Sequence, residues 1–339
     1  MSFAYSQIEM SHGAGGKATR KLIENLIAPG LMNPFLSCFD DAAVVDVGQH
    51  KLAFTSDSFV VNPTRFAGGS IGELAVNGTV NDLAVSGARP LALVLNFIIE
   101  AGLPSDVLKA EVDAVAKAAR LAGVNIVGGD TKVVEHGKAD HLFVTTAGIG
   151  LVNHSLSLDV ERIGVGDKIL LSGPIGDHGI TILLARGELD LESNLRSDTR
   201  SVWSLVEKLS SAIPRGLKWM RDPTRGGVAT SLNELAKDIQ LGIKLSEEAI
   251  PLNDSVRGAC ELLGLDPLHI ANEGQFLAVV SEEDADLALK ALRETPGGEA
   301  SVIIGEITET PVATVLAETA YGSTRVIDML VGDPLPRIC

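Results

Sequence analysis

Four short apolar runs in the first half of the chain limit the folds that are open to it. Each has the length of a β-strand, and two helical segments separate them. The clearer helix follows Pro104, with Ser105 as its expected N-cap and Gly123 as its stop. Its apolar stripe is expected to comprise Leu108, Val112, Val115, Ala119 and Ala122. The four runs are residues 41–47, 51–61, 91–99 and 141–149.

The second half of the chain repeats this mixture of strands and helices. It opens with a strand and a glycine-rich loop at 173–179, and helices and strands then alternate. The helices are expected at 201–212, 228–237 and 284–293. The strands are expected at 167–172, 275–280 and 301–307.

Polar turn residues between 153 and 166 mark a boundary between the two halves. The pattern therefore predicts an α+β protein with two αβ domains and a mobile tail, because Gly332, Pro334 and Pro336 cannot continue a helix or a central strand. The expected parts are an N-terminal segment at 1–37, domains at 38–152 and 153–327, and the tail at 328–339.

Charge and cysteine content exclude several classes of function. Lys and Arg number 28 against 44 Asp and Glu, a formal net charge of −16 that disfavours nucleic acid as a partner. Cys38, Cys260 and Cys339 are too widely spaced for a disulfide framework or a C-x-x-C metal site. The first residues lack a signal-peptide pattern, and no apolar run approaches the roughly 20 residues of a membrane span, so we expect a cytoplasmic protein.

Short acidic motifs stand at the ends of the elements predicted in the first half. Carboxylates gathered at such ends suit Mg²⁺, which takes oxygen ligands and bridges carboxylates to phosphates. The alternative for each aspartate is that it only caps a turn or a helix. The set favours a metal site, and its members are Asp40, Asp41, Asp57, Asp82 and Asp130.

Three polar residues interrupt the otherwise apolar helical segment at 71–87. Glu73, Asn77 and Asn81 lie four residues apart and therefore share one face of the helix. If this stripe is buried it requires a hydrogen-bonding partner, and the alternative is exposure to solvent.

The loop at 11–17 contains three glycines and a lysine but is no Walker loop. Ala18 follows Lys17 where Ser or Thr should stand, and Ser11 occupies the first glycine position. The loop fits either a lid over a triphosphate or a frayed terminus.

Two further motifs lie in the second half. Asp222-Pro223-Thr224-Arg225-Gly226-Gly227 runs directly into a helix, whose unpaired N–H groups make an anion site. Glu273 stands just before a strand and is either a general base or an ordinary turn carboxylate.

The last residue, Cys339, places a thiol at the end of a proline-stiffened tail. A prenylation box would have its cysteine four residues from the end, so prenylation is excluded. The thiol is expected to be exposed and reachable, although a chain can also end on cysteine by chance.

Taken in order, the acidic and glycine motifs resemble those of the ATP-binding superfamily of aminoimidazole ribonucleotide synthetase over nearly the whole chain. With the loop at 11–17, Glu273 and the terminal Pro336-Arg337-Ile338-Cys339, the chain resembles the carbamoyl-dehydratase family of hydrogenase maturation proteins. The resemblance implies two αβ domains, a four-stranded sheet that forms a barrel with its twin in a homodimer, and ATP with Mg²⁺ at the domain interface. The implied nucleotide-binding residues are Gly15, Gly16, Lys17, Asn81, Thr131, Asp222, Gly226 and Gly227.

The same resemblance implies a reaction. A carbamoyltransferase, HypF, loads a carbamoyl group on the thiol of Cys339, ATP activates the carboxamide oxygen, and loss of phosphate leaves a thiocyanate. Cyanide then passes to the iron of nickel-iron hydrogenase on a HypC and HypD scaffold. By the family pattern Glu273 removes the N–H protons and Lys132 orients the group, and His178 is a further catalytic candidate.

Other functions within the superfamily, and a non-catalytic role, would require different residues. A selenophosphate synthetase is expected to have Cys or selenocysteine beside the N-terminal glycine loop. This chain has Met10-Ser11-His12 there. Thiamin-phosphate kinase and the purine-pathway synthetase share the aspartate motifs but do not need Cys339. A non-catalytic ATP-binding scaffold would keep the aspartates and need neither the thiol nor turnover.

Overall fold

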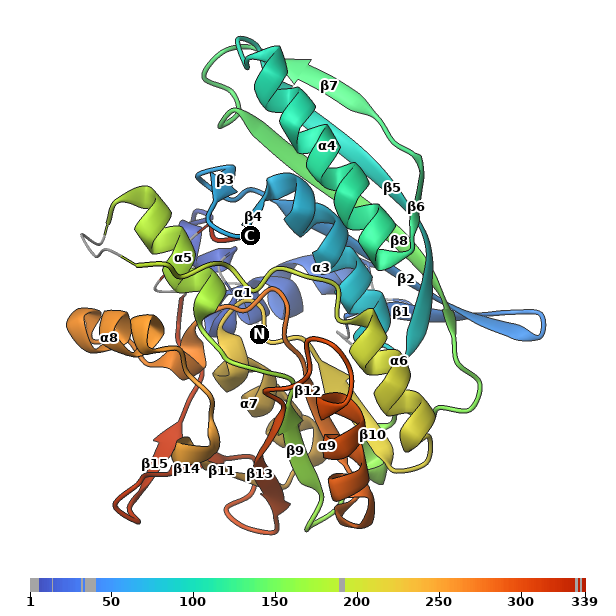
Figure 1. The fold of residues 1–339 in the computed structure, drawn as a ribbon, viewed down its shortest axis with the longest axis vertical. Coiled ribbons are helices and arrows are strands. Elements are labelled where there is room, and N and C mark those ends of the chain that lie inside the picture. The colour runs from blue at the N-terminus through green and yellow to red at the C-terminus, as the bar shows by residue number, and fades with distance from the viewer. Residues whose placement is uncertain are drawn as a thin grey trace.

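The computed structural model describes residues 6–13, 15–31, 33, 41–188, 193–332, 335 and 337–339. These residues form two large sheets with helices packed on them (Figure 1), and β3 and β4 pair in a separate two-stranded sheet. The arrangement confirms the α+β class and the two αβ units. Among them, no helix combines the length and the apolar character that crossing a membrane requires.

The first sheet contains all four strands predicted from the apolar runs. Its strand order is β1-β2-β8-β5-β6, and β7 also pairs with β5. The short strands β3, β4, β6 and β7 are not apparent from the sequence pattern. The bounds are β1 Ala43–Val47, β2 His50–Phe59, β3 Arg65–Phe66, β4 Gly69–Ser70, β5 Ala88–Glu100, β6 Asn125–Gly128, β7 Thr131–Val134 and β8 Leu142–Val152.

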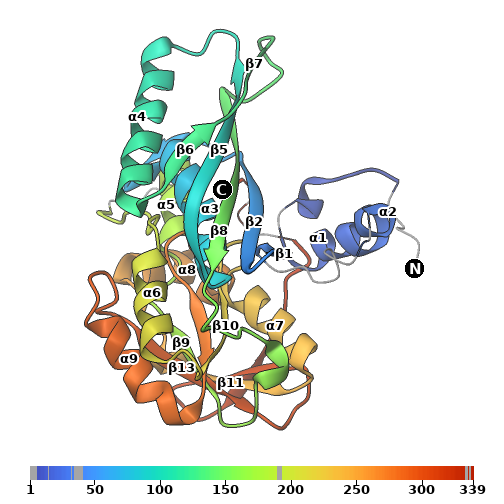
Figure 2. The ribbon, with the colours of Figure 1, turned by 90° about the vertical axis from the view of Figure 1, so that its right-hand side faces the viewer.

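Helices α3 (Ile71–Val85) and α4 (Ser105–Ala122) lie on one face of this sheet (Figure 2). Helix α3 contacts β2, β5 and β8 on one side and α6 (Trp203–Ala212) of the second unit on the other, so it is buried nearly all round. Two members of its predicted polar stripe, Asn77 and Asn81, are buried.

Two expectations for α4 are wrong. Pro104 takes the N-cap position with extended backbone, so Ser105 is the first helical residue and not the cap. Val112, predicted in the apolar stripe, is exposed, whereas Glu111 is fully buried. The reason is a polar contact that turns the buried face toward the start of α3.

The Glu111 carboxylate joins α4 to the first turn of α3. Its Oε2 accepts a hydrogen bond from the Gly72 N–H at 3.0 Å, and its Oε1 pairs with Arg65 Nε at 2.7 Å. An acceptor at a helix N-terminus satisfies an N–H group that has no partner within the helix. Glu111 therefore fixes the start of the helix that carries Asn81 and Asp82.

The second sheet has the strand order β10-β12-β9-β13-β11-β14-β15. The predicted strands at 167–172, 275–280 and 301–307 form β9, β12 and β13. The bounds are β9 Lys168–Leu171, β10 Leu217–Arg221, β11 Gly242–Ser246, β12 Leu277–Val280, β13 Val302–Thr308, β14 Val315–Glu318 and β15 Thr324–Ile327.

Helices cover both faces of the second sheet. Leu171 packs with α7 (Gly227–Ile239) in one core, whereas its neighbour Leu170 packs with α6 and α9 (Ala285–Arg293) in another. This alternation follows from the opposite directions of successive side chains in a strand. The helices predicted at 201–212, 228–237 and 284–293 are these three.

Two helices of the second half pack against the core of the first unit. They are α5 (Asp177–Arg186) and α8 (Asp254–Leu263), and buried residues from both belong to that core. The residues 177–179, predicted as part of a glycine-rich loop, form the first turn of α5.

The described N-terminal residues contact the tail, because Lys17 N and Ala18 N donate to Leu330 O and Val331 O. Helices α1 (Gly16–Leu22) and α2 (Ala28–Leu31) stand beside the first sheet (Figure 2). The described tail residues form no helix or strand, as predicted, but Leu335 and Ile338 are buried in the first core. In this structure the tail is therefore docked.

Glu111→Ala is expected to lower the free energy of unfolding by about 2–3 kcal/mol, because the Gly72 N–H loses its buried acceptor. Glu111→Gln keeps an acceptor and should lose less. Urea denaturation of both variants measures the difference. An alanine variant as stable as the parent would show that the contact contributes nothing.

Candidate active site

Three carboxylates from distant parts of the sequence meet at the junction of the two units. Oxygens of Asp41, Asp82 and Asp222 all lie within 4.8 Å of one another. Asp41 precedes β1, Asp82 is on α3, and Asp222 follows β10. Asp41 and Asp82, two members of the predicted acidic set, therefore lie close together in the fold. Asp222, predicted as a nucleotide-binding residue, lies beside them.

Asp57 adds a fourth carboxylate beside Asp82. It lies on β2, two residues after Thr55, so both side chains point toward α3. Thr55 Oγ1 donates to Asp82 Oδ2 at 2.7 Å, and Thr79 Oγ1 donates to Asp57 Oδ2 at 3.1 Å. These hydroxyls hold the two carboxylates in place on strand and helix.

The carboxyl groups of the cluster resist ionisation together. Burial raises the pKa of Asp82 well above its usual range, and the charges of Asp57, Asp222 and Asp41 raise it further. Burial and Asp41 likewise raise the pKa of Asp222. A divalent cation would relieve this repulsion, and the all-oxygen ligand set fits Mg²⁺.

Two arginines next to the cluster supply positive charge. Arg221 Nε contacts Asp41 Oδ1 at 2.9 Å, and its other nitrogens reach Glu234. The pKa of Arg225 is raised chiefly by the negative charge at Cys339, and also by Asp57. Arg225 is exposed, and its Nη1 donates to Gly13 O at 3.4 Å.

Arg225 was not among the predicted site residues. Arg225 lies inside the motif from Asp222 to Gly227, so the sequence did contain a signal for it. The prediction named only Asp222, Gly226 and Gly227 from that motif. Gly226 and Gly227 have positive φ values of 76° and 62° and lead into α7, as predicted.

Glu273 is buried close to these charges. Burial raises its pKa well above the usual range, and Asp222 and Asp198 raise it further, which makes it a strong proton acceptor once ionised. Asp198 accepts hydrogen bonds from the N–H groups of Glu273 and Gly274 at 3.1 Å. Burial raises the pKa of Asp198 to about 6.

Asp198 is a second residue that the sequence did not reveal. It belongs to an extended segment without a motif, and only the fold brings it to Glu273. Asn81 fastens the same segment to α3: its side chain donates to Arg200 O and Glu273 O and accepts from Val202 N at 2.8 Å. Asn81, a buried member of the polar stripe on α3, is therefore hydrogen-bonded to backbone groups of the second unit.

Several predicted residues do not join the cluster in this chain. Asp130 and Lys132 are exposed around the start of β7 and pair with each other, and Thr131 N donates to Asp130 Oδ1 at 2.8 Å. Lys17 Nζ pairs with Asp328 at 2.6 Å. Asp40 lies outside the described residues.

The glycine loop at the N-terminus lies against the site in its described part. An added Cβ at Gly15 would stand 2.9 Å from Arg225 Cβ, and one at Gly16 would stand 2.5 Å from Leu330 O. Backbone approaches so close require glycine. The loop therefore packs between Arg225 and Leu330, where the tail begins. These contacts do not decide between a lid over a triphosphate and a frayed terminus.

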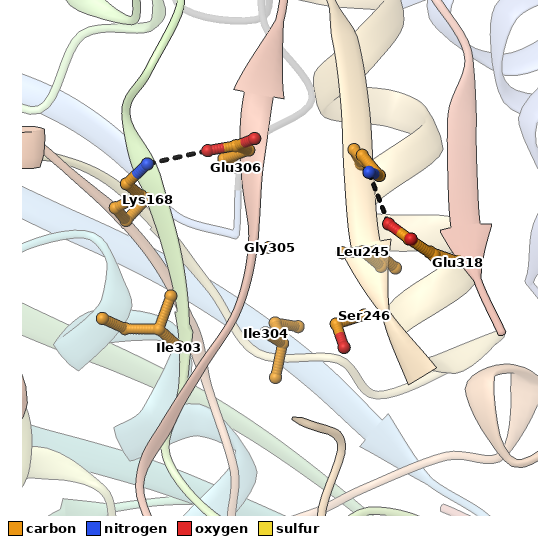
Figure 3. Close-up of a pocket in the computed structure, with 9 residues that line it drawn as sticks. Lys168, Leu245, Ser246, Ile303, Ile304, Gly305, Glu306 and Glu318 are labelled. Atoms are coloured by element: carbon orange, nitrogen blue, oxygen red, sulfur yellow. Dashed lines mark hydrogen bonds and ion pairs between the residues drawn. The ribbon is translucent and has the colours of Figure 1, made fainter. Parts of the chain in front are cut away.

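A separate pocket of about 310 Å³ lies on the second sheet, among β9, β13, β11 and β14 (Figure 3). Its charged residues pair with each other, Lys168 with Glu306 and Lys244 with Glu318. It contains none of the cluster residues.

Two family models match the chain. The AIR synthase related protein N-terminal domain covers residues 39–152, and the C-terminal domain of that family covers residues 164–318. The two sheets with a carboxylate cluster at their junction are thus those of an AIR synthase related protein.

More specific relatives define the family within this class. A carbamoyl dehydratase HypE of Bradyrhizobium diazoefficiens is 47% identical over 332 residues, which are 98% of this chain and 96% of the relative. The chain belongs to the carbamoyl dehydratase HypE family, whose members act in the maturation of nickel-iron hydrogenase.

Solved structures agree with this assignment. A chain of the crystal structure of a HypE–HypF complex matches with a TM-score of 0.86 and 42% identity, over 91% of this chain and 99% of that one. Hydrogenase maturation protein HypE in complex with ATP matches with a TM-score of 0.82 and 44% identity, over 98% and 100%.

The raised carboxyl pKa values predict a pH dependence. Without metal, the protein should become more stable as the pH falls from about 7 toward 5, because these groups bind protons in the folded state that the unfolded chain has already lost. Asp82→Asn should raise the stability at pH 7 and flatten this dependence.

The same variant should lose most of the stabilisation that Mg²⁺ gives to the parent. Thermal unfolding with EDTA and with Mg²⁺, across this pH range, measures both effects. If Mg²⁺ stabilised Asp82→Asn as strongly as the parent, Asp82 would not be a metal ligand.

Proposed function

We propose that the chain carries its own substrate on Cys339 and dehydrates it with Mg-ATP. The observation that carries this proposal is the docked tail: Cys339 O accepts from Val60 N at 3.0 Å, directly after β2, the strand that carries Asp57. The negative charge at Cys339 also raises the pKa of Arg225, as do the charges of Asp57, Asp82 and Glu273. The last residue thus shares one electrostatic environment with the carboxylate cluster.

The chemistry follows from the leaving group. The amide oxygen of a carbamoyl thioester leaves poorly, so the γ-phosphoryl group of ATP is transferred to it. One N–H proton is lost on phosphorylation, and loss of the second with inorganic phosphate turns the C–N bond into a nitrile. The products are a thiocyanate on Cys339, ADP and phosphate.

The metal site of this proposal uses the acidic cluster. Asp41, Asp57, Asp82 and Asp222 would hold Mg²⁺, which neutralises charge on the phosphates when bound. By the family resemblance we keep Asp40 and Asp130 as additional ligands, and Gly15, Gly16, Lys17, Asn81, Thr131, Gly226 and Gly227 as nucleotide-binding residues. Helix α7 would point its N-terminus at a phosphate.

Glu273 is the proposed base. Its buried position beside Arg225 and Asp198 suits it to accept an N–H proton, and its raised pKa keeps the acceptor basic. Lys132 is proposed to orient the carboxamide, on the resemblance alone.

The tail is anchored far enough away to serve a partner as well. Lys17 N and Ala18 N donate to Leu330 O and Val331 O, so the chain is fixed at Val331. The eight residue steps from Val331 to Cys339 span about 26–29 Å when extended. The tail can therefore leave the site, and we propose that it is then loaded by HypF, as the solved HypE–HypF complex supports.

We also propose a homodimer through the face of the first sheet that α3 and α4 leave open. Phe54, Val94 and Ile98 on β2 and β5 are large apolar side chains exposed on that face. Such a patch suits burial against a second copy, as in the dimeric barrel that the resemblance implies. Delivery of cyanide to a HypC and HypD scaffold completes the proposal.

Glu273→Gln keeps the shape of the base and removes proton acceptance. The carbamoylated variant should bind ATP normally and dehydrate at least about a hundredfold more slowly in a single turnover. Intact-mass spectrometry follows the loss of one water from the tail. A variant as fast as the parent would make Glu273 a structural residue and pass its role to another group.

Cys339→Ala should bind ATP normally but form no thiocyanate when HypF, carbamoyl donor and ATP are present. Cys260→Ala is the matched control, because Cys260 is buried and should not affect the reaction. Thiocyanate formation by Cys339→Ala would refute the carrier role and with it the proposed function.

A further inference from the structure

The residue before the carrier cysteine is held from the second unit. The Ile338 carbonyl oxygen lies 2.6 Å from His178 Nε2, on helix α5. An oxygen of the terminal carboxylate of Cys339 accepts from Val60 N at 3.0 Å, directly after β2 in the first unit. The Ile338–Cys339 peptide and the terminal carboxylate of Cys339, one on each side of the Cys339 Cα, are thus held by α5 and by the residue that follows β2.

The contacts of the His178 ring determine where its proton lies. A carbonyl oxygen only accepts, so Nε2 carries the hydrogen that reaches Ile338. Nδ1 then accepts from Ser197 Oγ at 2.8 Å, and Ser197 Oγ accepts in turn from Thr199 N at 3.1 Å. Both ring nitrogens are used, so the docked histidine has no lone pair left for a substrate proton.

The surroundings of His178 are apolar and close-fitting. The ring is fully buried and meets Phe66 edge to face, with the ring centroids 5.5 Å apart. Burial lowers the pKa of His178 to about 4, so the ring is neutral at physiological pH. Leu335 of the tail approaches the same turn of α5, because an added Cβ at Gly179 would lie 3.1 Å from Leu335 Cδ1.

Other groups hold the tail one residue earlier. Arg337 donates to Asp140 Oδ2 at 2.7 Å, and its carbonyl accepts from Arg186 at 2.7 Å. These groups lie nearer the surface, whereas the Ile338 side chain is only 2% exposed. The His178 bond is therefore the buried polar contact next to the cysteine.

We propose that His178 is a positioning residue, which holds the Ile338 carbonyl with its Nε2–H and thereby keeps the Cys339 side chain in the active site. This inference rests on the proposed function and deepens it. It gives His178 a role other than that of a proton acceptor: its neutral Nε2–H contributes to the docked state of the tail together with the contacts of Arg337 and Val60.

Without the donor, the Ile338 carbonyl would stay buried with no partner, whereas water satisfies it when the tail is released. Removing the donor therefore shifts the population from docked to released tail. The loss of one such bond should change this equilibrium about tenfold.

The matched pair of variants is His178→Phe and His178→Gln. Phenylalanine fills the ring space without a donor, whereas the glutamine amide can place an N–H near the position of Nε2. Digestion of the full-length protein with a serine carboxypeptidase, followed by intact mass, measures how often the tail is released. We expect trimming of residues 338 and 339 to be about tenfold faster in His178→Phe than in the parent, and close to the parent in His178→Gln.

Single-turnover dehydration of the carbamoylated protein gives the second readout. His178→Phe should slow this step about tenfold with unchanged ATP affinity, and His178→Gln should restore most of it. Ser197→Ala removes the hydroxyl that fixes the tautomer, and it should speed trimming severalfold if His178→Phe fails to fold.

Two results would overturn the inference. The first is that the tail of His178→Phe is as resistant to trimming as the tail of the parent. If His178→Phe does not fold, the same result in Ser197→Ala counts instead. The other is a His178→Gln variant whose tail is protected but whose dehydration is as slow as in His178→Phe, which would make His178 a proton acceptor. Because trimming needs neither carbamoyl donor nor turnover, failure of the proposed function would leave the trimming results unchanged.

Discussion

Mutual repulsion among buried carboxylates is the constraint around which this molecule is arranged. Asp41, Asp57, Asp82 and Asp222 come from four separate places in the chain, and the charges of the other three raise the pKa of Asp82. Such a group is costly to hold together in the absence of a cation. The two folded units supply the necessary rigidity, because α3 is buried between them.

The charge that balances this cluster is also what connects it to the tail. The charges of Cys339, Asp57, Glu273 and Asp82 all raise the pKa of Arg225. In the proposed function, docking of Cys339 brings the reacting group close to the phosphate site, and release of the tail removes it. A carrier that is part of the chain needs no affinity for a free substrate, only two tail states that are close in free energy.

Local patterns predicted much of the fold, and long-range pairing was beyond them. The boundaries of α4 follow from its amphipathic repeat and Gly123, and the long strands follow from apolar runs. The error at Val112 has a tertiary cause, because the bond from Glu111 to Gly72 turns the helix. Short strands such as β6 and β7 depend on pairing with β5 and carry little signal of their own.

The site was predictable where a motif marked it. Asp57, Asp82 and Glu273 stand in recognisable patterns, and the structure brings them together. Asp198 has no motif, and its role appears only when the backbone of residues 273 and 274 is seen to bond to it. The docking of the tail was equally invisible, because its proline-rich composition indicates only that it is irregular.

The central claim is that a group carried by Cys339 lies beside the metal of the carboxylate cluster. It can be tested by placing a ¹³C-carbamoyl label on Cys339 and adding ATP with Mn²⁺, whose unpaired electrons broaden nearby nuclear signals. The account predicts strong broadening of the carbamoyl resonance in the parent and little in Asp82→Asn. An unbroadened resonance in a parent protein shown to bind Mn²⁺ and ATP would contradict it.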